Sequence, residues 1–246
     1  ASPNIPTSSD IDPAGDDGDT DNNSKHFGVV TYTGNGSSNA ITGLGFQPDL
    51  VWGKCISASQ TGILIDSSRG QGLLFSSLAN AEQTSNGPFM TSYDSDGFTL
   101  ASSGSNPNDS GRTYVAWCWR ANGASTSSNS SGSITSTVQA NTKGGFSIMT
   151  YTGTGSNATI GHGLSAKPDF ILTKRRSSEQ TWGVYHTSLG ATKYLALNSS
   201  AAAGTDSTFW NNTEPTTSVI SLGTEGRVNG NSQTYVAYAW HNVEGY

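Results

Sequence analysis

Apolar residues alternate with polar or small residues in short runs along most of the chain, and turn-forming residues separate these runs. The runs of the first half that predict strands are 27–33, 49–56, 62–66, 72–76, 97–101 and 113–120. The last of them alternates most clearly, with Val115, Trp117 and Trp119 on one side. Successive side chains of a strand point to opposite faces. Because neither face of 113–120 is polar, we expect this strand to be central and covered on both sides.

Composition supports an all-β fold. The chain holds 30 glycines in 246 residues and is rich in Ser, Thr and Asn, and only 12% of its residues are charged. Glycine provides backbone conformations with positive φ, and Asn and Ser bond their own backbone in turns. The best helical candidates, 76–85 and 198–203, are too short to be stable alone. We therefore expect short strands joined by Gly/Ser/Asn-rich turns.

The second half of the chain repeats the first in the same order. The run FGVVTYTG from Phe27 is answered by FSIMTYTG from Phe146, and TYVAWCW from Thr113 is answered by TYVAYAW from Thr234. A repeat of about 100 residues has the size of an independent domain rather than of a solenoid unit. The repeat predicts two tandem β-sandwich (jelly-roll-like) domains. The alternative is one pseudo-symmetric sandwich to which each copy contributes a sheet.

Composition shifts indicate the domain boundaries. We expect an acidic extended leader at 1–24, a first sandwich repeat at 25–121, a Gly/Ser-rich linker at 122–143 and a second sandwich repeat at 144–246. The linker ends in an alternating stretch, 133–140, that is a candidate for an extra strand leading into the second repeat.

Charge is concentrated in the leader. Residues 1–24 hold six aspartates and no Lys or Arg, whereas the remainder of the chain carries 12 acidic and 12 basic residues. A neutral body without a basic cluster gives no electrostatic footprint for nucleic acid. No run approaches the 18 or so apolar residues of a membrane-spanning helix. We therefore expect neither nucleic-acid binding nor membrane insertion.

The residue types that carry catalysis or bind metals are scattered. No two of the four histidines are close in sequence, and no nucleophile elbow or phosphate loop occurs. Cys55 and Cys118 each lie in a predicted strand and are expected to be buried free thiols, with a disulfide as the alternative. We expect no enzymatic activity, no cofactor and no metal. The weak calcium candidates are the leader carboxylates of Asp17, Asp19 and Asp21.

One tryptophan differs from the others in its surroundings. Trp117, Trp119 and Trp240 lie in alternating terminal strands, where core positions are expected. Trp210 is followed by Asn211 and Asn212 in a polar segment that ends in proline. An aromatic ring beside amide groups is the chemistry of sugar recognition. Trp210, Asn211 and Asn212 are therefore the ligand-binding candidates, and a ring packed beneath a loop is the alternative.

The motifs of the repeat also resemble a known family. They are VVTYTGNGS from Val29, GLGFQPDLV from Gly43, SYDSDGFT from Ser92 and TYVAWCW from Thr113, together with their second-half counterparts. They are similar to an uncharacterised tandem-repeat domain family of predicted structural proteins of marine bacteriophages, which are tail-fibre-like or virion surface proteins. The resemblance covers roughly 25–246, and the acidic leader departs from it.

The resemblance implies a non-enzymatic virion structural protein, a tail-fibre-like or capsid-surface segment of a longer chain. It implies other virion proteins and a second copy of the chain as partners, the virion surface as location, and binding to a host surface glycan or receptor. The other classes are a glycan-degrading enzyme domain and a bacterial cell-surface adhesin. An enzyme of the first class would need two carboxylates about 5–10 Å apart, and Asp49 and Asp169 are the acids that both copies share.

Overall fold

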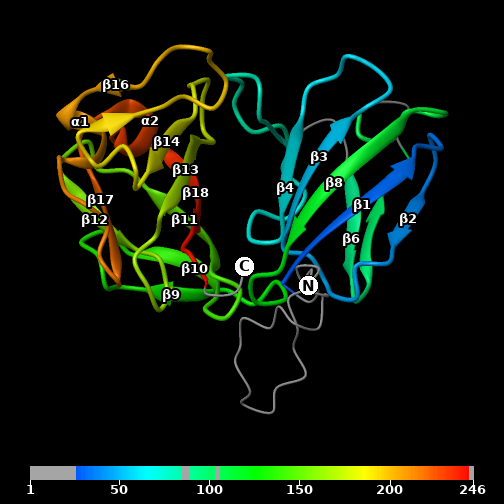
Figure 1. The fold of residues 1–246 in the computed structure, drawn as a ribbon, viewed down its shortest axis with the longest axis horizontal. Coiled ribbons are helices and arrows are strands. Elements are labelled where there is room, and N and C mark those ends of the chain that lie inside the picture. Colours follow the sequence, from blue (N-terminus) through cyan, green and yellow to red (C-terminus); the bar gives the residue numbers. More distant parts are fainter. Residues whose placement is uncertain (1–25, 85–88, 103–105, 244–246) are drawn as a thin grey trace, which may run out of the picture.

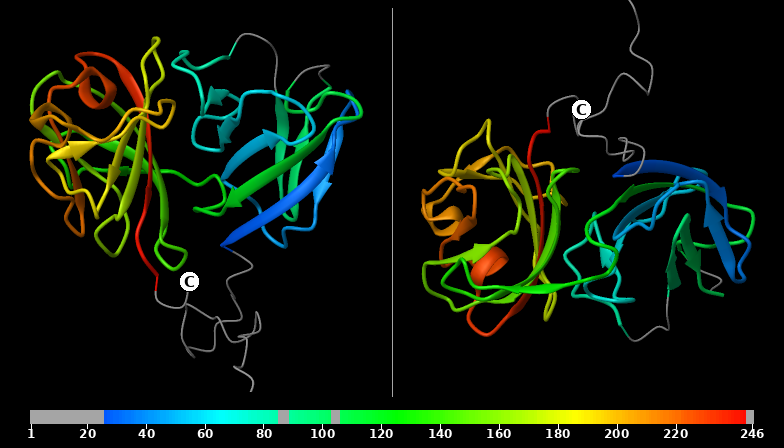
Figure 2. Two further views of the ribbon diagram at one scale, coloured as in Figure 1. Left: turned by 45° about the horizontal axis from the view of Figure 1, so that its top comes forward. Right: turned by 90° about the horizontal axis from the view of Figure 1, so that it is seen from below.

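A computed structural model describes residues 26–84, 89–102 and 106–243. The described chain is all-β, with strands joined into several antiparallel sheets and two short helices, α1 (Ser207–Trp210) and α2 (Gly226–Asn229). Two halves lie side by side (Figures 1 and 2). The leader with Asp17, Asp19 and Asp21 lies outside the described residues.

The first half contains two sheets that enclose one core. The larger sheet has the order β1 (Phe27–Thr33), β8 (Thr113–Trp119), β3 (Leu50–Cys55), β4 (Ile63–Asp66) and β5 (Leu74–Phe75). The smaller sheet has the order β2 (Asn39–Thr42), β7 (Gly97–Leu100) and β6 (Met90–Asp94). Ile41 and Phe98 from the smaller sheet pack with Val51, Ile65 and Ala116 from the larger one.

The second half is arranged in the same way around its main sheet. That sheet has the order β14 (Gly183–His186), β13 (Phe170–Arg175), β18 (Thr234–Trp240), β11 (Phe146–Thr152), β10 (Ser136–Asn141) and β9 (Ser127–Asn129). Two small sheets pair β12 (Ala158–Gly161) with β17 (Val219–Leu222) and β15 (Lys193–Tyr194) with β16 (Gly204–Thr205). A second core cluster, which includes Met149, Ile160, Phe209 and Ile220, belongs to this half alone.

Equivalent strands of the two halves pair in the same register. Phe27 is opposite Trp119 in the first half, and Phe146 is opposite Trp240 in the second. The candidate extra strand is present as β10, which pairs with β11 and so extends the sheet of the second half. In the first half, β1 is the edge strand of the large sheet, and no described residue forms a further strand beside it.

A third core cluster joins the halves. Leu64 and Leu74 lie on the face of the first large sheet that points away from the core of the first half. They pack with Ile148, Leu172 and Tyr238 on the corresponding face of the second large sheet, and all five side chains are fully buried. Strand β18 is therefore central and covered on both faces. Strand β8 is also central, but the side that carries Val115, Trp117 and Trp119 is only half-buried. The expectation that it is covered on both sides was wrong for that face, because the second half covers only part of it.

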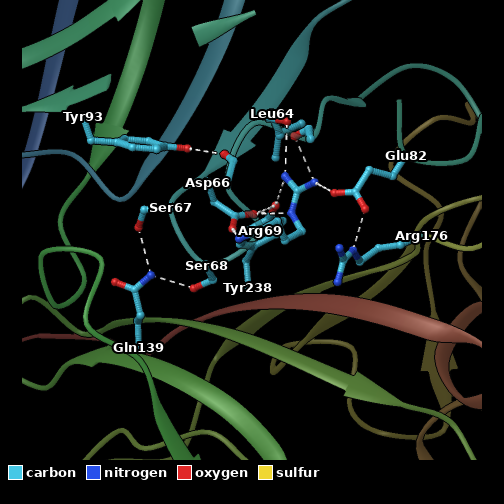
Figure 3. Close-up of polar contacts among 12 residues, drawn as sticks. Leu64, Asp66, Ser67, Ser68, Arg69, Glu82, Tyr93, Gln139, Arg176 and Tyr238 are labelled. Carbon is cyan, nitrogen blue, oxygen red and sulfur yellow. Dashed lines mark hydrogen bonds and ion pairs between the residues drawn. The ribbon is translucent and has the colours of Figure 1, made fainter. Parts of the chain in front are cut away.

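A buried polar network reinforces this seam (Figure 3). Arg69 Nε donates to Asp66 Oδ2 at 2.5 Å, and Arg69 Nη1 donates to Glu82 Oε1. Across the seam, Tyr238 Oη donates to Asp66 Oδ2 at 2.6 Å and Arg176 Nε donates to Glu82 Oε2 at 2.8 Å. The Arg69 and Asp66 side chains are 0% exposed. Two cations and two carboxylates thus neutralise one another at the boundary between the halves.

The buried lysine of the second half also crosses the seam. Lys174 is 0% exposed, and its Nζ donates to the carbonyl oxygens of Ala79, Arg175 and Gln180 at 3.0, 3.1 and 2.8 Å. Burial lowers the pKa of this ammonium group from 10.5 to about 8. Three carbonyl acceptors satisfy its three N–H donors. Through the bond to Ala79 O, the lysine connects the first-half loop that holds Ala79 to β13.

Both cysteines are free and buried, as the sequence predicted: Cys55 is 2% exposed and Cys118 is 0% exposed. Burial raises the pKa of the Cys118 thiol, which suppresses the reactive thiolate. We expect neither thiol to react with a disulfide reagent at about pH 8 in the native chain, and both to react in denaturant without reductant. Fast labelling of the native chain, or labelling that requires reductant, would contradict this.

Candidate functional site

Trp210, expected to present a stacking surface, is a core residue. It lies in α1, is 1% exposed, and packs edge-on against Tyr185 with ring centroids 5.8 Å apart. The side chain of Asp206 caps this helix by accepting from Thr208 N, and the cap holds the segment over the core. The interpretation of Trp210 as an accessible sugar platform is therefore corrected, because no ligand ring can reach an indole at that depth.

Asn211 and Asn212 remain on the surface beside it. Their φ angles are 52° and 49°, the left-handed conformation that Asn tolerates better than most residues. Asn211 Oδ1 accepts a hydrogen bond from Asn157 Nδ2 at 2.9 Å. Local geometry thus explains both residues, and they lack the adjacent aromatic plane that made them ligand candidates.

The carboxylates shared by both repeats are engaged in structural hydrogen bonds. Asp49 is 0% exposed and accepts from the backbone N–H groups of Ala121, Gly123 and Ala124 at 2.7, 2.9 and 2.7 Å. Asp169 Oδ2 accepts from Asn242 N at 2.9 Å. In each half, this carboxylate holds the segment that follows the last strand, and that role explains why a repeat retains it.

Two acids of the β6–β7 hairpin, the exposed Asp96 and the half-buried Asp94, also accept structural hydrogen bonds. Asp96 accepts from the N–H groups of Gly43 and Gly45 at 3.1 and 2.6 Å, and these bonds lower its pKa. Asp94 Oδ2 accepts from Thr99 Oγ1 at 2.7 Å. Within the described ranges, no three His, Cys, Asp or Glu side chains are grouped as a metal site would require.

His162 has a hydrogen-bond partner at each ring nitrogen. It is fully buried, its Nδ1 accepts from Leu164 N at 3.1 Å, and its Nε2 lies 3.3 Å from Thr216 O. These partners define a neutral ring with the proton on Nε2. Burial lowers the pKa of His162 from 6.5 to about 4, since a charged ring would be desolvated and Nδ1 could no longer accept.

This geometry predicts acid sensitivity. Because the folded pKa is depressed, the unfolded chain binds the proton first, and stability is lost as pH falls from 6.5 to about 4. The expected loss is about 3 kcal/mol, at about 1.4 kcal/mol per pH unit. His162→Asn, which keeps an acceptor for Leu164 N, should remove most of this slope in urea unfolding measured across the range. An unchanged slope in the variant would contradict the assignment.

A tryptophan-lined groove lies on the half-covered face of the first large sheet. Trp52 on β3 is directly opposite Trp117 on β8, and both are half-buried. The groove has a volume of about 420 Å³, and its lining residues are Trp52, Lys54, Gly62, Ser76, Trp117 and Trp119. Lys54 Nζ donates to Gln60 O. The described lining therefore combines three indoles with one ammonium group and one hydroxyl, and it includes no acid.

At one position that lines the groove, the first repeat has a glycine where the second repeat has a tryptophan. The shared Gln-Thr pair is followed by Gly62 in the first half and by Trp182 in the second. Trp182 is fully buried, stacks on Tyr238 with centroids 6.5 Å apart, and donates from Nε1 to Phe75 O at 2.8 Å. Tyr238 is the repeat counterpart of Trp117. In the first half, the place beside Trp117 that an indole occupies in the second half is therefore open.

A smaller hollow borders the groove where the halves meet. It has a volume of about 290 Å³ and is lined by Phe27, Trp119, Gly144, Trp240, His241, Asn242 and Val243. The Trp119 and Trp240 rings meet edge to face with centroids 5.7 Å apart. Both tryptophans are half-buried and pack against the shared core, so they are seam residues rather than the fully buried core positions expected from alternation.

The chain is thus an all-β protein whose described surface carries one groove lined by three tryptophans. It belongs to the family described as Domain of unknown function (DUF7483), whose model matches residues 22–246. Searches of curated proteins and of solved structures gave no match. Over the described residues, no helix is both long and apolar enough to span a membrane.

Proposed function

We propose that this chain is a non-enzymatic structural protein of a bacteriophage virion, displayed on the particle as a tail-fibre-like or capsid-surface segment. The observation that carries the proposal is the joining of two similar halves through a common core and a buried ionic network. A spacer or assembly element must hold its shape under load, and such a seam suits that task. The phage context comes from the resemblance of the repeat motifs.

The arrangement of acidic side chains supports a non-enzymatic role over a glycan-degrading one. The carboxylates that both repeats share bind backbone N–H groups, and that of Asp49 is buried. A glycosidase needs one carboxyl free to give a proton and another free to act on the sugar or on water. The carboxylates of Asp49 and Asp169 already accept these backbone hydrogen bonds and are not free for either task.

We further propose that each half is a β-sandwich domain of jelly-roll-like form, and that the chain assembles with other virion proteins and with further copies of itself. Each half has a core cluster of its own, which supports two domains over one sandwich shared between the repeats. In this proposal, the chain displays its exposed groove toward a surface glycan of the host.

Particle composition tests the proposal. Virions of the phage that encodes the chain should contain it as a stoichiometric component by mass spectrometry, and antibodies raised against residues 22–246 should label the particle surface by electron microscopy. Purified particles that lack the chain, or that carry it only inside the capsid, would overturn the proposal.

A further inference from the structure

We infer that the groove between Trp52 and Trp117 is a carbohydrate-binding site that takes an oligosaccharide by stacking one sugar ring against Trp117. The inference deepens the proposed function and rests on it for the biological source of the sugar, a host surface glycan. Its chemistry rests on the geometry of the groove.

The first argument is the shape of the open space. In the second half, the indole of Trp182 lies nearly parallel to the Tyr238 ring, with an interplanar angle of 27°. Gly62 replaces that indole in the first half, so the fold leaves room for a flat ring beside Trp117. The volume of about 420 Å³ lies within the range of small-ligand sites, about 300–1,000 Å³.

The second argument is the chemistry of the lining. A pyranose ring has a C–H face that packs on an indole, and it keeps its hydroxyl groups at the rim. Small-ligand sites combine apolar and aromatic walls with a few polar groups that fix orientation. Here the walls are almost wholly apolar, so stacking on the indoles would supply the binding, and Lys54 and Ser76 are the lining residues that carry a polar side-chain group.

The third argument is that two tryptophan rings of the first half stay partly exposed, although the fold covers the equivalent side chains of the second half. The same face of the second half carries Leu172 and Tyr238 at the counterpart positions, and the first half covers them. In the first half, Trp52 and Trp117 remain half-buried, with the 50% exposed Val29 directly across from Trp117. Apolar surface left open beside a packed seam marks an interaction site.

The test uses the full chain on a glycan array of neutral and acidic bacterial oligosaccharides. The oligosaccharide with the strongest signal is then titrated calorimetrically. Trp117→Ala and Trp52→Ala should each weaken binding by at least about tenfold, as expected for central aromatic contacts. Trp117→Tyr, which keeps an aromatic plane, should retain most of the affinity. Ile56→Ala, at a 58% exposed position outside the groove lining, is the control and should bind like the parent.

A filled-groove variant separates binding from folding. Gly62→Trp combined with Ser76→Ala places an indole where the second half has one and removes the hydroxyl that a Cβ at position 62 would meet. It should abolish binding and leave the melting temperature equal to or above that of the parent. Loss of binding with an intact fold would support the site.

Three results would overturn the inference. One is oligosaccharide binding that persists in the filled-groove variant. Another is the absence of binding to every array member. The third is concentration-dependent dimerisation of the parent that Trp117→Ala abolishes, which would make the face a contact between copies. None of these alters the virion-composition result, so failure of the site and failure of the proposed function are distinguishable.

Discussion

Replacing Arg69 by Met is expected to destabilise the chain by about 3–5 kcal/mol, because it leaves the buried carboxylate of Asp66 without a cation. The Asp66 side chain is 0% exposed and that of Glu82 is 7% exposed. Glu82 would keep its ion pair with Arg176. Asp66 would keep only the hydrogen bond from the neutral Tyr238 hydroxyl, which does not replace the positive charge of Arg69. Equilibrium unfolding in urea, followed by circular dichroism, gives the difference in free energy.

An exposed ion pair provides the control. The side chains of Lys167 and Glu214 are 40% and 46% exposed, and their charged atoms lie 3.4 Å apart. Lys167→Met should therefore change stability by less than about 1 kcal/mol. If Arg69→Met cost no more than this control, the network would contribute little to the union of the halves, and the mechanical argument for a structural role would lose its main support.

Trp210→Ala is expected to cost about 3–5 kcal/mol of stability, the usual range for deleting a large buried aromatic side chain. Trp210 fills the core of the second half against Tyr185 and Phe209. Truncation would leave a cavity beneath α1. The same unfolding measurement detects the loss, and binding of any ligand should fall only in step with the unfolded fraction.

Trp117→Ala is the matched comparison, since that indole is half-buried on a sheet face. It should cost about 1–2 kcal/mol, because partly exposed side chains lose less transfer free energy on truncation. The reverse order, with Trp210→Ala the milder change, would show that Trp210 is accessible in solution. Trp210 would then return as a binding candidate.

Strands in which apolar residues recur at alternate positions could be predicted from the sequence, whereas strands made mainly of small and polar residues could not. The run 27–33 coincides with β1, and the other predicted strands of the first half differ from the observed ones by one or two residues at one or both ends. Strand β2 has the sequence NAIT and β6 has MTSYD, and neither was predicted. Each has few apolar residues and gains its strand conformation from pairing with β7.

The candidate site was misplaced for a related reason. Trp210 stands among polar residues in the sequence, yet a capped helical turn folds it inward. Trp117 stands in a cleanly alternating strand, yet its face is only half-covered. The signal that could have identified the groove was present in the repeat itself, because glycine in one copy replaces a buried tryptophan in the other.

The sequence by itself determined the all-β class, the internal repeat, the central place of the last strand of the first half and the burial of both thiols. These features follow from local alternation and turn chemistry, which act over a few residues. Only the tertiary structure decided which sheet face the neighbouring half covers, which acids are neutralised and where an indole remains accessible. Those outcomes depend on contacts between residues as far apart as Arg69 and Tyr238, and no local pattern encodes them.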